Sequence, residues 1–252
     1  IFTSNHILCT NTDARVLRAV ALLAKESGAK KIYIAEAPGL AEPISAMNTW
    51  GFGIVASEVG AELGGLSSAH YERVPAPHAL ASKEYAIPKV VLEADKVISV
   101  SPLKTHGFAG VTMTLKNVGI GVAPNVVYGS PKIGLRHDKL ARTIADVCEI
   151  VGIDYAVIGG IYGMEGQGPT NGDPVYSGIV VAGADAVAVD SVGTMCMGFT
   201  PANYGTMRVA EEIGLGTMKD IEIVGNKVEE VVVQYLPPPG HGPASYGEVY
   251  GW

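Results

Sequence analysis

The stretch Asp13–Ala37, DARVLRAVALLAKESGAKKIYIAEA, decides the fold class, because it reads as one helix followed by one strand. Val16 and Val20 recur at helical spacing and a glycine follows the last turn, so a helix is predicted over residues 13–27. The segment 30–37, KKIYIAEA, has the composition of a short strand. A helix followed by a strand is half of the unit from which parallel sheets are built.

The same alternation continues along the chain. Further helices are expected over residues 49–63, 138–151, 185–197 and 201–214, and further strands over 96–100, 155–158, 179–182, 221–224 and 228–234. The strands are continuous apolar runs, which is typical of strands buried on both faces. We therefore expect an α/β fold with a mainly parallel sheet, flanked by helices on both faces in Rossmann-like layering.

The 252 residues contain no strong linker and no internal repeat. Residues 1–236 are therefore expected to form a single α/β domain, with room for a small inserted lobe over 100–135. The last segment, 237–252, is rich in proline and glycine and predicts a C-terminal arm on the surface.

The charge balance bears on the classes of partner. The net charge is −7 and no lysine- or arginine-rich block occurs, which argues against nucleic acid and against anionic membrane surfaces. No apolar run reaches the roughly 18 residues that a spanning helix needs. A small anionic molecule is the partner that we expect, while a homodimer and a redox partner protein stay open.

Three cysteines, Cys9, Cys148 and Cys196, are scattered and form no C-x-x-C pair. This usage is typical of reduced thiols and favours a cytoplasmic location. The chain starts at Ile1 without a methionine, so a trimmed targeting segment stays open. Cys148 and Cys196 fall in apolar helical segments and are expected in the core, whereas Cys9 lies in a polar loop and is a candidate ligand.

The stretch Ser101–Asn117, SPLKTHGFAGVTMTLKN, follows a predicted strand and places basic side chains close together. Lys104 and His106 are two residues apart, and Lys116 lies after two glycines that permit a turn. Two ammonium groups beside an imidazole would bind an anion and lower the histidine's pKa, leaving a general base or a metal ligand. The alternative is that both lysines are solvated loop residues and the histidine lies at the surface.

A second unusual segment, residues 159–174, is expected to be a glycine-rich loop. Gly163, Gly166 and Gly168 surround Glu165, and backbone N–H groups in such a loop can bind an anion. Glu165 is then a candidate acid, base or metal ligand. The loop has neither a P-loop ending nor dinucleotide-binding spacing. The alternative is a tight loop with an exposed glutamate.

Three further polar residues are candidates for this crevice or for helix ends. His137 precedes a predicted helix, where Asp138 is an alternative N-cap. Asp185 is a plausible N-cap of the helix that follows it. Asp190 lies inside an apolar helix, where an unpaired carboxylate is costly, so we expect it to have a partner, either a lysine of the site or a backbone group.

These residues carry a resemblance to a known family. The block K-T-H-x-x-x-G-x-T-x-x-x-K-N at 104–117, M-E-G-x-G-P at 164–169 and AGADAVAVDSVGTMCMGF at 182–199 resemble the uncharacterised family called domain of unknown function 362. The similarity runs from about residue 10 to 225. Members of that family often carry an iron–sulfur segment, but no such cysteine cluster is present here. The usual lysine-proline-asparagine turn is replaced by Thr3-Ser4-Asn5, and an aspartate usual near Gly159 is absent.

The 104–117 block is also similar to a segment of the nickel-pincer lactate racemase family. That resemblance implies that Lys116 matches the lysine that anchors the cofactor and His106 a catalytic histidine. His137 matches the metal ligand loosely.

Three hypotheses of function follow. The first is an enzyme whose crevice binds a small anionic metabolite or a phosphorylated cofactor through Lys104, Lys116, Asn117 and the glycine-rich loop. In it His106 is the base or, with His137, a ligand of a divalent metal, and the reaction is proton transfer next to a carboxylate. The second is a carrier of a metal or cofactor for a redox partner. The third is a purely structural domain.

Overall fold

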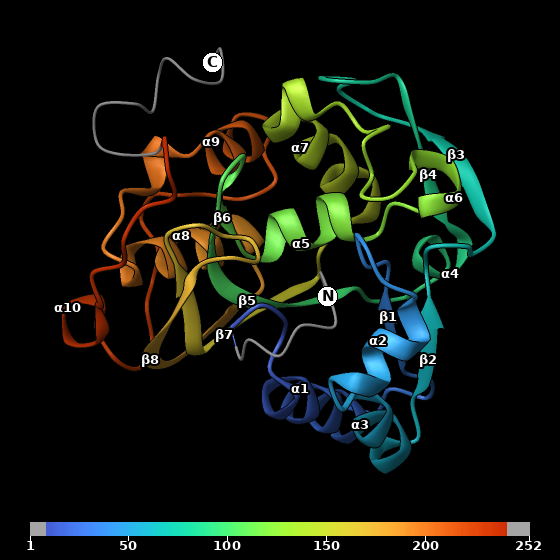
Figure 1. Cartoon of the computed structure of the whole chain (residues 1–252), viewed down its shortest axis with the longest axis horizontal. Coiled ribbons are helices and arrows are strands. Elements are labelled where there is room, and N and C mark those ends of the chain that lie inside the picture. Colours follow the sequence, from blue (N-terminus) through green and yellow to red (C-terminus); the bar gives the residue numbers. More distant parts are fainter. Residues whose placement is uncertain (1–8, 241–252) are drawn as a thin grey trace.

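The computed structural model describes residues 9–240 and shows a mixed α/β protein (Figure 1). The N-terminal prediction is confirmed. Helix α1 spans Ala14–Glu26, the Asp13 side chain caps it by accepting from the Arg15 N–H, and β1 spans Tyr33–Glu36. The Thr3-Ser4-Asn5 turn and most of the predicted arm, 237–252, lie outside the described residues.

The predicted helix over 49–63 is replaced by shorter elements. Helix α2 (Pro43–Thr49) ends before Gly51, whose φ of 80° interrupts the helix, and α3 (Phe52–Val59) follows, then β2 (Glu62–Gly65). Strand β2 pairs in parallel with β1. With α1, these elements enclose a core of their own at one side of the molecule (Figure 1).

A hairpin and several short helices come next along the chain. Strand β3 (Tyr71–Pro75) pairs antiparallel with β4 (Glu84–Pro88), and α4 (Lys89–Leu92) follows at once. Helix α6 spans Asn125–Tyr128 and the 3-10 helix η1 spans His137–Lys139.

The central sheet has four strands in the order β6 (Gly110–Thr112), β5 (Ile98–His106), β7 (Tyr155–Glu165) and β8 (Asp173–Gly183). The pair β5–β7 is parallel, whereas β5–β6 and β7–β8 are antiparallel. Over residues 9–240 the chain thus has two parallel and three antiparallel strand pairs. The α/β class is confirmed, but a mainly parallel sheet with Rossmann-like layering is not.

Both segments that the sequence suggested as loops are largely strand. Strand β5 continues through Lys104 to His106, and a turn, β6 and helix α5 (Thr114–Gly121) complete the first segment. In the second, β7 runs to Glu165 and β8 begins at Asp173. A Cβ at Gly163 would collide with the Tyr235 hydroxyl and the Leu103 carbonyl. The glycine is therefore needed because these groups pack closely against the strand, and it does not mark a loop.

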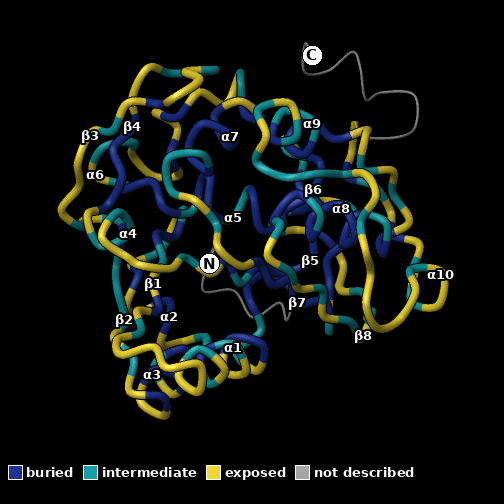
Figure 2. Tube along the Cα trace, turned by 180° about the vertical axis from the view of Figure 1, so that it is seen from behind, coloured by how far each residue is buried: buried dark blue, intermediate teal, exposed yellow. Residues whose placement is uncertain are grey.

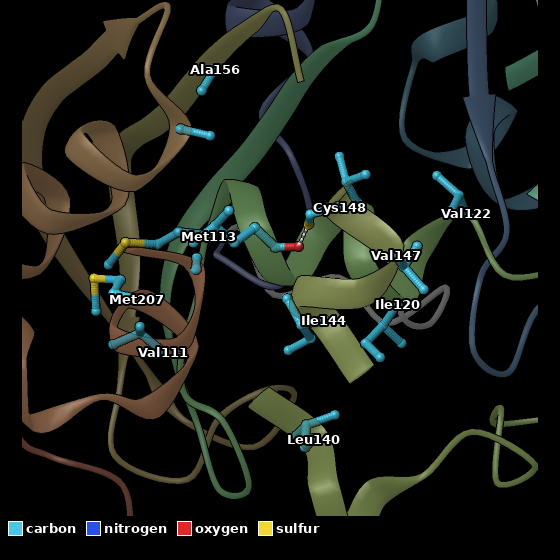
Figure 3. Packing of buried hydrophobic residues seen from close by; sticks show 14 of the residues in the cluster. Val111, Met113, Ile120, Val122, Leu140, Ile144, Val147, Cys148, Ala156 and Met207 are labelled. Atoms are coloured by element: carbon cyan, nitrogen blue, oxygen red, sulfur yellow. Dashed lines mark hydrogen bonds between the residues drawn. The ribbon is translucent and has the colours of Figure 1, made fainter. Parts of the chain in front are cut away.

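Four helices pack with the sheet around the main core. They are α5, α7 (Leu140–Val151), α8 (Ala186–Cys196) and α9 (Gly205–Glu212), and the short η2 (Pro201–Asn203) precedes the last. The thiol of Cys148 on α7 donates to the Leu115 carbonyl of α5 at 3.2 Å (Figure 3). The traces of β5 and α5 are largely buried in the middle of the molecule, while exposed residues gather in the outer loops (Figure 2).

The predictions for the C-terminal third are partly wrong. The helices over 138–151, 185–197 and 201–214 are present with shorter bounds. Residues 221–224 form no strand, and α10 (Val228–Val231) replaces the second predicted strand. At α10 the Glu230 carboxylate accepts from the Lys227 N–H, and this local cap favours a helical turn over an extended chain. No helix within the described residues has both the length and the apolar character needed to cross a bilayer.

Candidate functional site

A cavity of about 70 Å³ lies where six parts of the chain meet. Its wall comes from residues 10–12 before α1, the end of β1, strands β5 and β6, one face of α5, and the loop that carries Lys132. The α5 face presents residues 116, 117, 120 and 121, whose spacing by four places them side by side on a helix. The space exceeds what a single water needs, so a compact charged group has room.

Lys104 enters the cavity from β5 and is 4% exposed. Its Nζ donates to the Thr10 carbonyl at 2.6 Å and to the Pro169 carbonyl at 3.1 Å. Burial, reinforced by the nearby Lys116, lowers the pKa of Lys104 to about 7. This amine therefore loses its proton far more readily than that of an exposed lysine.

Lys132 is the basic residue that sequence reasoning missed. It is 2% exposed, and its Nζ donates to the carbonyls of Ile120 at 2.7 Å and Gly121 at 3.0 Å, at the carboxyl end of α5. Burial lowers its pKa to about 7, an effect that Glu36 partly opposes. Nothing in the segment GSPKIG distinguishes this lysine from a solvated one, because its partners are carbonyls that only the folded α5 presents.

Lys116 differs from the other two lysines. It projects from the first turn of α5 and is half-buried, and its side chain makes no hydrogen bond or ion pair with any residue in the range 9–240. Burial lowers its pKa to about 8, and the carboxylate of Glu36 at the end of β1 works in the opposite direction. Glu36 is the one acidic residue among the described residues that line the cavity, so one carboxylate faces three lysines.

Two hydroxyl groups in the cavity wall are unsatisfied. The Oγ1 atoms of Thr10 and Thr112 are buried and have no hydrogen-bond partner within the part of the chain that the structure describes. Asn117 also lines the cavity, and its Nδ2 donates to the Ser99 hydroxyl at 3.1 Å. Buried polar groups normally have partners, so these hydroxyls fit a ligand that supplies them.

Helix α5 is held at both ends by buried charges. At its start, Asp190 of α8 accepts from the Thr114 N–H at 2.8 Å, the Leu115 N–H at 3.0 Å and the Thr114 hydroxyl. Lys132 binds the opposite end. A carboxylate at the amino end and an ammonium at the carboxyl end both match the helix dipole. The partner predicted for Asp190 is therefore backbone and hydroxyl, not a lysine, although burial still raises its pKa to about 6.

His106 does not line the cavity. It is buried, and its Nδ1 accepts from the N–H groups of Phe108 at 3.0 Å and Ala109 at 3.2 Å, within the turn between β5 and β6. His137 also lies outside the cavity wall, and its Nδ1 donates to the Leu135 carbonyl at 2.9 Å. His106 and His137, the two predicted metal ligands, therefore do not line the cavity with Lys116. The structure gives no support to the metal ligands that the resemblance to the nickel-pincer family implies.

Glu165 and the glycine segment support the cavity from outside. Glu165 accepts from the Leu236 N–H at 2.7 Å, and the Gly168 carbonyl accepts from the Gly107 N–H at 3.0 Å. A Cβ at Gly168 would collide with the Thr105 carbonyl, and Gly166 has a φ of 68° that favours glycine. None of the predicted residues Gly163, Glu165, Gly166 and Gly168 lines the cavity, but the segment reaches Lys104 through the Pro169 carbonyl.

The structure therefore brings together three of the residues singled out from the sequence: Lys104, Lys116 and Asn117. Asp185 is confirmed as the N-cap of α8, because it accepts from the Val187 and Ala188 N–H groups. All three cysteines are buried free thiols, Cys9 included. Within residues 9–240 no three His, Cys, Asp or Glu side chains are grouped as metal ligands.

Comparisons with known proteins identify the family but not the activity. The chain is 30% identical over 129 residues to a thylakoid-associated protein of Synechocystis, a match that covers 50% of this chain and 40% of that protein. No solved structure matches the chain. The family described as "Domain of unknown function (DUF362)" matches residues 2–195, which is more than half of the sequence, and the chain therefore belongs to this family.

Proposed function

We propose that the cavity binds the anionic group of a small metabolite or phosphorylated cofactor. The observation that carries the proposal is the convergence of Lys104, Lys116 and Lys132 on a space whose described wall holds a single carboxylate. Three amines in one small space repel one another when charged, and an anion placed among them removes that repulsion. Binding would raise the pKa of the lysines that contact the anion and so favour their charged forms.

The available donors fit a carboxylate or a phosphate. Lys116 has all of its N–H groups available, and Lys104 and Lys132 each have one beyond the two that they give to carbonyls. The hydroxyls of Thr10 and Thr112 add two neutral donors. The cavity lies beyond the carboxyl end of β1, which pairs in parallel with β2, and ligands of parallel sheets commonly bind outside the carboxyl ends of the strands.

We further propose that the reaction at this site is proton transfer next to a carboxylate, with a cavity lysine as the base. A base works best when its pKa lies near the working pH, and the cavity amines have pKa values of about 7 to 8. His106 lies outside the wall and has its Nδ1 engaged by the turn. The alternative, a non-enzymatic carrier, stays a hypothesis and predicts binding without turnover.

A cytoplasmic location is also a proposal. It is supported by three unpaired thiols, which are typical of a reducing compartment. The thylakoid-associated relative offers a different location, and cell fractionation distinguishes the two.

The test is anion binding measured by calorimetry and by thermal shift at pH 6 and low salt. Sulfate, phosphate, acetate and malonate are the probes, and a ligand at 100 times its Kd stabilises the folded state by about 2.7 kcal/mol. We expect stabilisation of the wild type and a large loss with Lys116→Ala. The matched control is Lys25→Ala on the exposed face of α1, which should behave as the wild type. If no probe stabilises the wild type, or if Lys116→Ala responds equally, the proposal fails.

A further inference from the structure

The cavity also contains the parts of a covalent site. Lys104 and Lys132 each bind two backbone carbonyls, which fixes their amines in place. Lys116 has no such tether within the described residues, so its nitrogen is available to a ligand in the same space. The three lysines therefore divide into two whose amines are fixed by backbone carbonyls and one whose amine is available to react.

We propose that Lys116 forms a Schiff base with the carbonyl group of a small 2-oxo acid, whose carboxylate binds Lys104 and Lys132. This inference rests on the proposed anion site and names its substrate class. A lysine becomes more nucleophilic at neutral pH when it is desolvated. Burial lowers the pKa of Lys116 to about 8 against the opposing effect of Glu36, and Lys116 lines the same small cavity as Lys104 and Lys132. A carbonyl next to a carboxylate would place the reacting carbon beside the group that the fixed lysines bind.

The reaction balances without an oxidant or a reductant. The lone pair of the neutral Lys116 amine attacks the carbonyl carbon, a C–N bond forms, and the carbonyl oxygen takes a proton to give a carbinolamine. The nitrogen then expels that hydroxyl as water, and a C=N bond replaces the C=O bond. The ammonium of Lys104 or Lys132 is the proton source, and the amine protons of Lys116 return to these groups.

The unsatisfied hydroxyls fit this sequence of steps. Thr10 and Thr112 are buried with no partner for Oγ1 among the described residues, and both line the cavity. Each can donate to the developing hydroxyl of the carbinolamine and accept from it. The Schiff base would also make the neighbouring C–H bond more acidic, which agrees with the proposed proton transfer next to a carboxylate.

Reductive trapping tests the proposal. The intact protein is incubated at pH 7 with pyruvate or 2-oxobutyrate and sodium cyanoborohydride, and the adduct is measured by intact mass and located by peptide mapping. We expect one reduced adduct per chain on Lys116, no adduct with lactate, and suppression by excess sulfate. Lys116→Arg should remove this adduct, whereas Lys25→Ala should keep it. Unfolding curves of each variant show whether a lost adduct reflects a lost fold.

The outcomes separate this inference from the anion site. If sulfate and malonate bind but cyanoborohydride traps no adduct on Lys116, the Schiff base is refuted and the anion site stands. If trapping is spread over exposed lysines and is insensitive to sulfate, the Schiff base is also refuted. If neither anion binding nor trapping occurs in the folded wild type, both proposals fail.

Discussion

Replacing Gly119 by alanine tests whether α5, the helix that carries Lys116 and Asn117, is positioned by close contact with α7. A Cβ at Gly119 would lie 2.7 Å from Ile144 Cγ2, 2.8 Å from its Cα and 2.9 Å from its carbonyl oxygen. Side-chain rotation relieves the first contact only, because the other two atoms are backbone of α7. The two helices must therefore move apart to accept the methyl group.

The expected magnitude combines two opposed effects. Alanine improves helix propensity by up to about 1 kcal/mol, whereas overpacking a tight helix contact costs about 1–3 kcal/mol. Because two of the three close contacts are to backbone, we expect the upper part of that range and a net loss of about 2 kcal/mol. For a chain of this size the loss corresponds to a fall in Tm of about 4–8 °C.

Gly121→Ala is the matched control on the same helix. The nearest atom to a Cβ there is Asn117 Oδ1 at 3.9 Å, and the φ of Gly121 is not in the left-handed region. Alanine at 121 should therefore leave the free energy of unfolding unchanged or raise it slightly. Urea titration followed by circular dichroism measures both variants, and Gly119→Ala should also weaken sulfate binding, because α5 is displaced. If Gly119→Ala is as stable as the wild type, the inferred close contact between α5 and α7 is refuted.

Three further outcomes follow from the charges and hydrogen bonds. Sulfate affinity should fall at least about tenfold between pH 6 and pH 9 in calorimetry, because Lys104 and Lys132 lose their protons near pH 7; a flat profile would contradict the assigned cations. Asp190→Ala should lower the free energy of unfolding by about 1–3 kcal/mol and weaken sulfate binding, because it releases the start of α5. Asp185→Ala removes the cap of α8, so it should lower the free energy of unfolding without changing sulfate affinity. Tyr85→Phe should lose about 1–2 kcal/mol in urea titration, because its hydroxyl donates to a buried carboxylate of α7 at 2.9 Å; an unchanged midpoint would count against that bond.

Local signals account for the elements that could be predicted from the sequence. Helix α1 has an apolar face and the Asp13 cap, and α8 has the Asp185 cap, so both begin where the sequence says. These features depend on residues within one turn of each other. Such local signals carry no information about long-range contacts. The bounds of elements in the middle of the chain depend on those contacts and were predicted less well.

The errors at β5 and β7 have a common physical cause. Lys104 made the end of β5 look like a solvated loop, yet the strand continues because the lysine is buried against the Thr10 and Pro169 carbonyls, 94 and 65 residues away. Gly163 suggested a loop, although it lies in a strand where Tyr235 and Leu103 approach closely. In both cases the partner that explains the residue is distant in the sequence.

The candidate site could be predicted only in part, because some of its residues are neighbours in the sequence and others are not. Lys104 and Lys116 belong to one short block, so their spacing indicated a shared cavity. Lys132 enters it from a separate loop and is fixed by the end of α5, which no spacing rule reveals. His106 lies two residues from Lys104 on the same strand, which suggested that both side chains enter one cavity. Instead, its Nδ1 accepts from the N–H groups of the turn that follows the strand.

The energy of the buried lysines gives the strongest reason to expect a ligand. For Lys104 and Lys132 the fall in pKa from 10.5 to about 7 means that each charged form is disfavoured in the folded protein by about 5 kcal/mol relative to an exposed lysine. The net stability of a typical domain is only about 5–15 kcal/mol, so two such penalties are large. A methionine of similar length would fill either position without this penalty. An anion that restores both charges recovers part of that energy, and the recovered energy becomes binding affinity.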